Sequence, residues 1–351
     1  MKLIHASDIH LGSKIDSTFP KEKAKQRQLE IRNTFRKMVE YADEKGVEVI
    51  LLSGDVFDSD RPLKKDKDFF YSIINSHPHI DFIYLKGNHD QQIEEQTSAN
   101  LKCFSSVWQS YRYGKIVISG IEMTPENCTS FYSILSLQKE DRNIVLLHGQ
   151  VSDTMGMDRI YLRRLRNKQI DYLALGHVHK HQEGKLDDRG KYAYSGCLEG
   201  RGFDEIGEHG FILLTVEDEI KTEFIPFQER LIVEEKVDIS AASDAYSAAQ
   251  LVKKIPFVKE WIYRIVLVGE TETDDETLAE DLLKYLSDQC FFLSVKDQTK
   301  RKINTAVYQK DLSLKGEFVR TVEADLTLSD EEKNKIIRLG LKALANEEVD
   351  L

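Results

Sequence analysis

Five short segments that carry histidine or aspartate each follow an apolar run of the sequence. They are Asp8-Ile9-His10, Gly54-Asp55, Gly87-Asn88-His89-Asp90, His148-Gly149 and Gly176-His177-Val178-His179. Carboxylate, amide and imidazole groups are all ligands of divalent transition metals. Two such ions a few ångströms apart can hold a phosphate ester and turn a water molecule into a nucleophile. The segments therefore predict a two-metal centre that hydrolyses phosphoesters.

The spacing within these segments indicates how the ligands share the metals. Asp8 and His10 are two residues apart, so on an extended segment both would project from the same side of the backbone, and His177 and His179 would do the same. Asp55 suits the bridging position, because a glycine before it lets the backbone approach the metals closely. Each pair could thus aim at one centre.

Asn88 and His148 would complete the ligand set with an amide oxygen and an imidazole. Because Asp8 and Asp55 would be the only charged ligands, the two dications would keep a net positive charge of about two, which suits a phosphodiester. This mixture of ligands favours Mn²⁺, Fe or Zn²⁺ over Mg²⁺. We expect two divalent ions, with manganese as the first choice.

His89 lies between the expected ligand Asn88 and Asp90. It is therefore left free to protonate a leaving alkoxide or to stabilise the transition state. Asp90 could fix the tautomer of His89 and raise its basicity. We expect both residues to be catalytic.

A single histidine after a strand is more often a structural residue than a metal ligand. That interpretation is kept for the histidines outside the five segments, which are His5, His77, His79, His181 and His209. For the segments themselves it would require five coincidences at strand ends, and we therefore favour the metal centre.

The apolar runs before the segments predict buried strands. They cover residues 2–6, 47–53, 81–85, 143–147 and 170–175, and predicted helices lie at 26–45, 64–75 and 159–168. Strand and helix alternate at the start of the chain, which is the rhythm of a βαβ fold. Such folds place their functional groups at the carboxyl ends of the strands.

The sequence predicts a division into three parts. Residues 1–226 contain all the histidines and form the expected catalytic domain, residues 227–300 alternate strand and helix in a small α/β domain, and residues 301–351 form a tail. Ser329, followed three residues later by Glu332, predicts a capping box that opens an amphipathic helix. We expect this helix to dock on its own chain, with docking on a partner as the alternative.

The composition is that of an ordinary globular protein, with 41% hydrophobic and 31% charged residues. The net charge of −11 is unusual for a protein that binds nucleic acid. Most of the acidic excess, however, lies after residue 226. Four scattered cysteines argue against a zinc knuckle or a disulfide framework. Since we expect neither a signal peptide nor a transmembrane segment, we predict a cytoplasmic protein that does not associate with a membrane.

In these five segments the chain resembles the calcineurin-like metallophosphoesterases, whose pattern D-x-H, G-D, G-N-H-[DE], H and G-H-x-H is matched in every element. Longer strings resemble the SbcD-type DNA-repair exonucleases, and they run from His5 to Gly12, from Gly54 to Pro62 and from Tyr194 to Glu205. The resemblance is specific over residues 1–227 and covers the rest by architecture only.

The resemblance implies an α/β fold with a four-layer αββα core, in which two mixed β-sheets are flanked by helices, and with a small C-terminal α/β capping domain that helps to position DNA. By motif position, Asp8, His10, Asp55 and His179 would hold one metal. Asp55, Asn88, His148 and His177 would hold the other, with His89 catalytic. The resemblance also implies a homodimer and an ABC-type ATPase partner with a long coiled coil. Since the tail after Thr299 shows one convincing helix, we expect the platform for that partner to be reduced.

Arg163, Arg164 and Arg166 belong to the densest basic group of the sequence and are candidates for contacts to DNA phosphates. The alternative is a helix that turns its leucines inward and leaves the arginines in solvent. For the whole protein, the resemblance implies a metal-dependent DNA nuclease, an exonuclease of DNA repair. The main alternative is a phosphodiesterase or phosphatase of the same superfamily that acts on a small nucleotide or phosphoester. A catalytically silent scaffold is a third class, disfavoured because every expected ligand is present.

Overall fold

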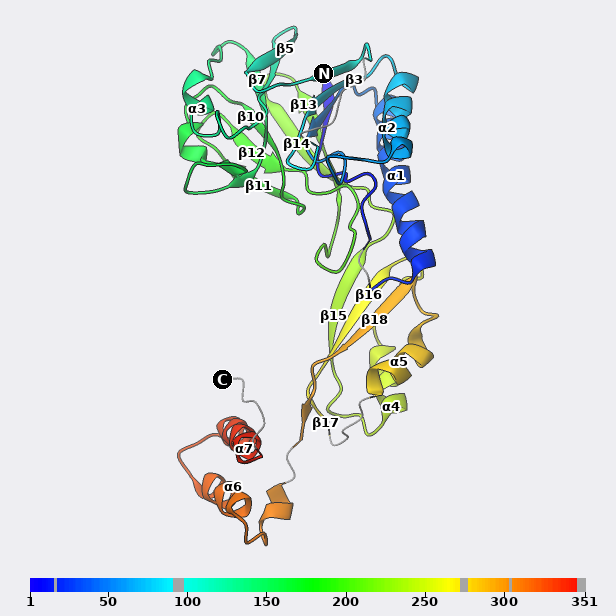
Figure 1. The fold of residues 1–351 in the computed structure, drawn as a ribbon, viewed down its shortest axis with the longest axis vertical. Helices are drawn as coiled ribbons and strands as arrows, with labels where there is room; N and C mark the ends of the chain where they lie inside the picture. Colours follow the sequence, from blue (N-terminus) through cyan, green and yellow to red (C-terminus); the bar gives the residue numbers. More distant parts are fainter. Residues whose placement is uncertain (16–17, 91–97, 272–276, 303–304, 346–351) are drawn as a thin grey trace. The chain divides into compact units, whose positions relative to one another are not determined.

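The structure is a computed structural model that describes residues 1–15, 18–90, 98–271, 277–302 and 305–345 (Figure 1). The chain forms two compact units. The first comprises Met1–Glu234 and Glu260–Ile262, and the second comprises Glu235–Lys259 and Tyr263–Leu351. All the expected metal ligands belong to the first unit.

The first unit contains two mixed sheets of six strands each. One sheet has the order β14-β13-β1-β2-β3-β4, in which β1 to β4 are parallel and β13 runs antiparallel to both β1 and β14. Its strands are β1 (Lys2–Ala6), β2 (Val49–Ser53), β3 (Asp81–Leu85), β4 (Leu101–Cys103), β13 (Gly210–Val216) and β14 (Ile220–Pro226). The parallel strands β1, β2 and β3 end at the same edge, where the first three histidine and aspartate segments begin.

The other sheet has the order β11-β12-β10-β7-β6-β5, with four parallel central strands and an antiparallel strand at each edge. Its strands are β5 (Gln109–Tyr113), β6 (Ile116–Gly120), β7 (Arg142–His148), β10 (Tyr172–Gly176), β11 (Gln182–Lys185) and β12 (Lys191–Tyr194). The last two histidine segments lie at the carboxyl ends of β7 and β10.

Three apolar cores separate four layers. The core between the sheets contains residues of both, such as Leu51 of β2 and Leu146 of β7. Helices α1 (Lys21–Glu44) and α2 (Lys64–Ser76) pack on the outer face of the first sheet. The short helix α3 (Phe131–Ile134) and irregular segments cover the outer face of the second, and Figure 1 shows α3 on the opposite side of the unit from α1 and α2. This arrangement confirms the predicted core of two mixed sheets flanked by helices.

The predicted helix at residues 159–168 was wrong. Arg159–Ile160 forms strand β9, which pairs with β8 (Gln150–Val151), and a 3₁₀ turn, η1, follows at Leu162–Arg164. Asn167 and Gln169 have φ angles of 61° and 65°, which a right-handed helix excludes. Leu165 is buried as the expected helix required, but Leu162 is only half-buried.

The second unit contains a three-stranded sheet in the order β15-β16-β18. Its strands are β15 (Ile232–Asp238), β16 (Ile262–Val268) and β18 (Phe292–Asp297), and they alternate along the chain with α4 (Ala245–Val252) and α5 (Leu278–Leu286). Two short strands, β17 (Glu270–Thr271) and β19 (Lys300–Arg301), pair with each other. Helix α5 packs on β18 and on α4.

The tail contains two helices, α6 (Leu314–Ala324) and α7 (Asp330–Leu344), after a 3₁₀ turn, η2, at Thr305–Tyr308, so the expectation of a single helix was wrong. Helix α6 escaped notice because its buried side is short. The capping box is present, since Ser329 N donates to Glu332 Oε2 at 2.8 Å and Glu332 N donates to Ser329 Oγ at 3.3 Å. Ile337 of α7 is buried in a cluster with residues of α6, so part of the apolar stripe packs on its own chain.

None of the helices within the described part of the chain has both the length and the apolar composition needed to cross a bilayer.

His5 connects the two sheets within the core. Its side chain is fully buried on β1, and its Nδ1 lies 2.9 Å from the hydroxyl of Tyr172 on β10. Burial disfavours the charged ring and lowers the pKa of His5 from 6.5 to about 3. Between these two values the unfolded chain binds a proton at this residue and the folded chain does not. This group therefore lowers the free energy of unfolding as the pH falls from 6.5 toward 3.

We predict that His5→Asn, which keeps a polar atom near the position of Nδ1, makes unfolding less dependent on pH. Urea unfolding without metal, measured at pH 7.5 and pH 5, should show the wild type losing about 2 kcal/mol more than the variant over this interval. Equal losses in the two proteins would show that His5 is not neutral in the fold.

Candidate metal centre

The seven expected ligands lie at the carboxyl ends of β1, β2, β3, β7 and β10. Six of them form two groups, and within each group the ligand atoms all lie within 4.8 Å of one another. The groups are Asp8, His10 and His179, and Asp55, His148 and His177. The expectation from spacing that His177 and His179 aim at one centre was therefore wrong, since they lie in different groups. The seventh, Asn88, lies beside the second group.

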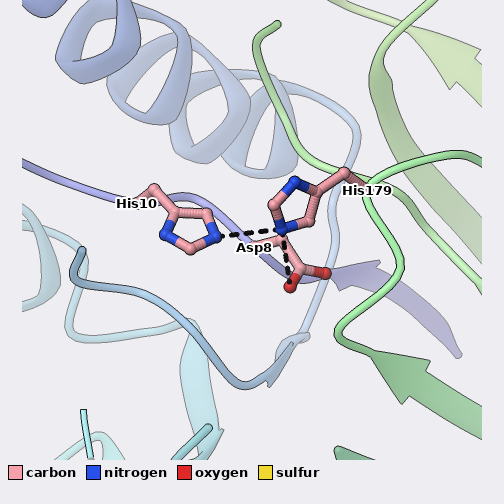
Figure 2. A group of neighbouring side chains, drawn as sticks. All are labelled: Asp8, His10 and His179. Carbon is pink, nitrogen blue, oxygen red and sulfur yellow. Dashed lines mark hydrogen bonds and ion pairs between the residues drawn. The ribbon is translucent and has the colours of Figure 1, made fainter. Parts of the chain in front are cut away.

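In the first group two imidazoles point toward each other (Figure 2). The Nε2 atoms of His10 and His179 are 3.2 Å apart, and His179 Nε2 is 3.8 Å from Asp8 Oδ1. A neutral imidazole nitrogen without a proton is an acceptor, and two acceptors attract each other only through a shared cation or proton. This arrangement fits a metal ion better than it fits hydrogen bonding within the protein.

The ligand atoms of the second group are equally close, but they form nitrogen–oxygen pairs that hydrogen bonds can also join. The amide oxygen of Asn88 lies 3.0 Å from His148 Nε2 and 3.2 Å from His177 Nδ1, and His148 Nε2 is 3.4 Å from Asp55 Oδ2. Together the two groups offer carboxylate, amide and imidazole donors, which fit Mn²⁺, Fe or Zn²⁺.

Four of these residues have backbone conformations that side chains rarely adopt. The φ angles of Asp8, His10, Asp55 and His177 are 52°, 51°, 53° and 98°. Strand β1 ends at Ala6, so the expected extended segment carrying Asp8 and His10 was wrong, although both side chains reach one group. Each such residue costs about 1–3 kcal/mol and persists only where its surroundings hold it in place.

Hydrogen bonds between strand ends hold these conformations. Asp8 N donates to Gly54 O, and His10 N donates to Asp55 O, both at 3.0 Å. His177 N donates to the carboxylate of Asp8 at 3.0 and 3.1 Å, which links the two sheets. Hydrogen bonds between the strand ends therefore help to fix the positions of the ligand residues.

Glycines allow the strand ends to come this close. A Cβ atom on Gly54 would lie 2.2 Å from His148 Nδ1, one on Gly87 would lie 2.1 Å from Asp55 Oδ1, and one on Gly176 would lie 2.0 Å from Ser53 O. The space before Asp55, which the sequence suggested was needed for the metals, is in fact occupied by a histidine ring.

Three imidazoles are oriented from behind by acceptors. His179 Nδ1 lies 2.7 Å from Glu205 Oε1, His10 Nδ1 lies 3.1 Å from Asp58 Oδ1, and His148 Nδ1 lies 2.9 Å from Ser53 O. Such contacts place the proton on Nδ1 and leave Nε2 free to bind a metal. Sequence reasoning missed Glu205 and Asp58 as functional residues, although both lie in the strings that carry the resemblance.

Asp55 and His148 form a charged pair. Burial opposes the charge on Asp55, but His148 and the N–H of His89 outweigh it and lower the pKa of this carboxyl well below its usual range. Burial also opposes the charge on His148, but Asp55 raises the pKa of His148 to about 9. Because metal binding requires the neutral imidazole, an ion held by His148 would displace a proton.

His89 and Asp90 do not act as a pair in the structure, and this expectation was wrong. The Asp90 carboxylate accepts hydrogen bonds from Val56 N at 2.9 Å and from Gly87 N and Tyr84 Oη at 2.5 Å each. Burial and the nearby Asp55 raise the pKa of Asp90 to about 6. Asp90 therefore supports the loop backbone and does not orient the ring of His89.

The ring of His89 instead lies beside the first group. Its centroid is 5.2 Å from that of His10, and its Nδ1 is 3.2 Å from Asp58 O. Residues 58–61, Asn88 and His89 line an open pocket of about 460 Å³. This position, exposed and next to ligand residues, suits proton transfer to a bound substrate.

The candidate DNA contacts lie elsewhere on the surface. They are Arg163, Arg164 and Arg166, which are exposed around η1 and belong to neither metal group.

We predict that Gly54→Ala abolishes binding of at least one metal ion, because the added Cβ would displace the ring of His148. Gly46→Ala is a matched control, since Gly46 also has a positive φ but no atom lies within 4 Å of an added Cβ. Both variants should lose about 1–2 kcal/mol of stability from backbone strain. Isothermal titration with Mn²⁺ should find fewer bound ions only in Gly54→Ala, and full binding by this variant would contradict the prediction.

Comparisons with known proteins identify sequences that this chain resembles. The chain is 27% identical over 234 residues to the DNA double-strand break repair protein Mre11 of Saccharolobus solfataricus, a match that covers 61% of this chain and 60% of that one. It is 23% identical to the Mre11 protein of Methanosarcina acetivorans, over 68% of this chain and 41% of that one. It is also 27% identical to YhaO of Bacillus subtilis, an uncharacterised metallophosphoesterase, over 72% and 67% of the two chains. The matches thus span less than two thirds of either Mre11 protein.

The family model for calcineurin-like phosphoesterases matches residues 1–181, which is more than half of the chain and includes every expected ligand. The chain therefore belongs to the calcineurin-like phosphoesterase family.

Proposed function

We propose that this protein is a metal-dependent DNA nuclease, an exonuclease of DNA repair that hydrolyses phosphodiesters with a water activated by two metal ions. The observation that carries this proposal is the convergence of two ligand groups at one edge of the sheets. Membership in the phosphoesterase family supports the hydrolytic chemistry. The matches to two proteins named for DNA double-strand break repair support DNA as the substrate.

The ligand set divides between two ions in this proposal. Asp8, His10 and His179 would hold one ion, Asn88, His148 and His177 would hold the other, and Asp55 would be shared between them. When bound, the two ions, which we take to be Mn²⁺, supply the positive charge that activates water and stabilises the phosphate.

The chain's own contribution to the reaction is proton transfer and orientation. His89 protonates the leaving alkoxide from its exposed position beside the first group. Its Nδ1 faces the carbonyl oxygen of Asp58, so its Nε2 is free to face a substrate in the open pocket.

The substrate and partners are proposed from the same resemblance. The α/β unit that the sequence placed at residues 227–300 would act as a cap that positions DNA, and the protein would work in the cytoplasm as a homodimer beside an ABC-type coiled-coil ATPase. Such a partner would dock on the two tail helices, α6 and α7, which pack against each other through Val319, Val322 and Ile337.

A phosphodiesterase or phosphatase that acts on a small nucleotide remains the second candidate, because the same centre serves several substrates and the surroundings select among them. The metallophosphoesterase YhaO, whose function is uncharacterised, matches a larger share of this chain than either Mre11 protein, which favours keeping this candidate.

One assay separates the candidates. Mn²⁺-loaded protein should degrade end-labelled linear DNA faster than a cyclic dinucleotide or a chromogenic phosphodiester.

We predict that His89→Asn binds both ions with wild-type affinity and loses about 10²- to 10⁴-fold in turnover on DNA. His79→Asn, an exposed histidine paired with Asp43, is the control and should keep full activity. Wild-type turnover by His89→Asn would contradict the proposed role.

The exposed arginines around η1 give a separate prediction about DNA binding. If they contact phosphates, the triple variant Arg163→Ala, Arg164→Ala, Arg166→Ala should bind DNA more weakly, and its salt slope should fall by about 0.9 for each lost contact. The control removes the same charge with Lys2→Ala, Lys45→Ala and Lys115→Ala, which are exposed near the opposite edge of the sheets. An unchanged affinity and slope in the arginine variant would assign these side chains to solvent.

A further inference from the structure

We propose that Arg201 is a positioning residue that sets the affinity of one metal position and not of the other. It would do so by holding Asp58 and Glu205 against the imidazoles of His10 and His179. The inference rests on the proposed two-metal function. It adds that the two positions differ in what sets their affinity for the metal.

Arg201 joins two carboxylates that are far apart in the sequence. Its Nη1 donates to Asp58 Oδ1 at 3.1 Å, and its Nη2 donates to Glu205 Oε1 at 2.6 Å. Its Nε lies 3.1 and 3.2 Å from the two oxygens of Glu205, and its main-chain N donates to Glu205 Oε2 at 2.7 Å. The guanidinium is therefore fixed by several bonds in a side chain that is only 18% exposed.

Each of these carboxylates also faces a metal-ligand histidine. Asp58 Oδ1 lies 3.1 Å from His10 Nδ1, and Glu205 Oε1 lies 2.7 Å from His179 Nδ1. The contacts form a continuous chain from one imidazole through the guanidinium to the other. Arg201 Nη2 is also 3.0 Å from His179 Nδ1, but the shorter contact to Glu205 and the ligand role of Nε2 both place the ring proton toward the carboxylate.

The second metal position differs at His148, whose Nδ1 faces the neutral carbonyl oxygen of Ser53. His177 Nδ1 faces the oxygen of Asn88, a proposed ligand of the same ion, so this contact lies on the metal side of the ring. An anionic acceptor makes an imidazole a stronger metal ligand than a neutral acceptor does. The first position therefore has a carboxylate behind each of its histidines, whereas His148 of the second has a neutral carbonyl, and Arg201 contacts both carboxylates.

The loop that carries Arg201 is held independently of the metal ligands. Arg27 of α1 is fully buried, and its Nη2 donates to Glu199 Oε1 and to Gly200 O at 2.6 Å each. The backbone next to Arg201 is thus fixed to helix α1. A change in the Arg201 side chain should alter the contacts of Asp58 and Glu205 without moving the loop.

The test is a Mn²⁺ titration of Arg201→Met, which removes the charge and the donors but keeps much of the side-chain volume. Isothermal titration of the full chain should show one ion bound about 10- to 100-fold more weakly than in the wild type and the other unchanged. Arg201→Lys, which keeps the charge, should fall between the two. Arg112→Met removes an arginine that makes a two-bond contact with Asp141 at the surface, and this control should leave both affinities unchanged.

Two further variants make the result specific. Glu205→Gln should weaken the same ion as Arg201→Met, and Asn88→Ala should weaken the other ion, so that the combination of Arg201→Met with Asn88→Ala weakens both. Equal weakening of both ions by Arg201→Met, or no weakening in a folded protein, would overturn the inference. If Arg201→Met does not fold, Glu205→Gln decides by the same criterion. A wild-type protein that binds no Mn²⁺ would instead overturn the proposed function itself.

Discussion

The close approach of the two sheets at the carboxyl ends of their central strands is the constraint on which the site depends. Three glycines lie at this contact, Gly54 and Gly87 from one sheet and Gly176 from the other. A Cβ atom added to any of them would collide with an atom of a neighbouring strand end or ligand. Because β2 and β10 meet there, His148 and His177 from the second sheet can face Asp55 and Asp8 from the first. Without this contact the fold would hold two half-sites.

The strained conformations at Asp8, His10, Asp55 and His177 follow from the same contact. A strand that continued straight would carry its side chains past the edge of the sheet, whereas a left-handed residue turns the carboxylate or imidazole back toward the other sheet. The strain is tolerated because rigid strands and three apolar cores lie directly behind it. The apolar cores that stabilise the fold therefore lie behind the site, whereas the strained backbone conformations lie at the site itself.

The sequence predicted well the strands that carry the segments and the residues that converge at their ends, because buried strands and closely spaced histidines and aspartates leave strong local patterns. It could not predict that Asp90 supports the backbone of Val56 and Gly87, since that role depends on contacts between separate strand ends. Glu205 and Asp58 were missed for the same reason: nothing in the local pattern of a carboxylate shows that it will lie behind a distant histidine. The arginine-rich stretch at 159–168 was wrongly predicted as a helix because its first residues pair with Gln150–Val151, a contact that the local pattern does not show.

The central claim is that two metal ions bind side by side and share Asp55. The most direct test is a crystal of the protein grown with manganese and measured at the manganese absorption edge. The account predicts two anomalous peaks per chain, one beside Asp8, His10 and His179 and one beside Asn88, His148 and His177, with an oxygen of Asp55 in contact with both. A single peak, or two peaks of which only one touches Asp55, would contradict it.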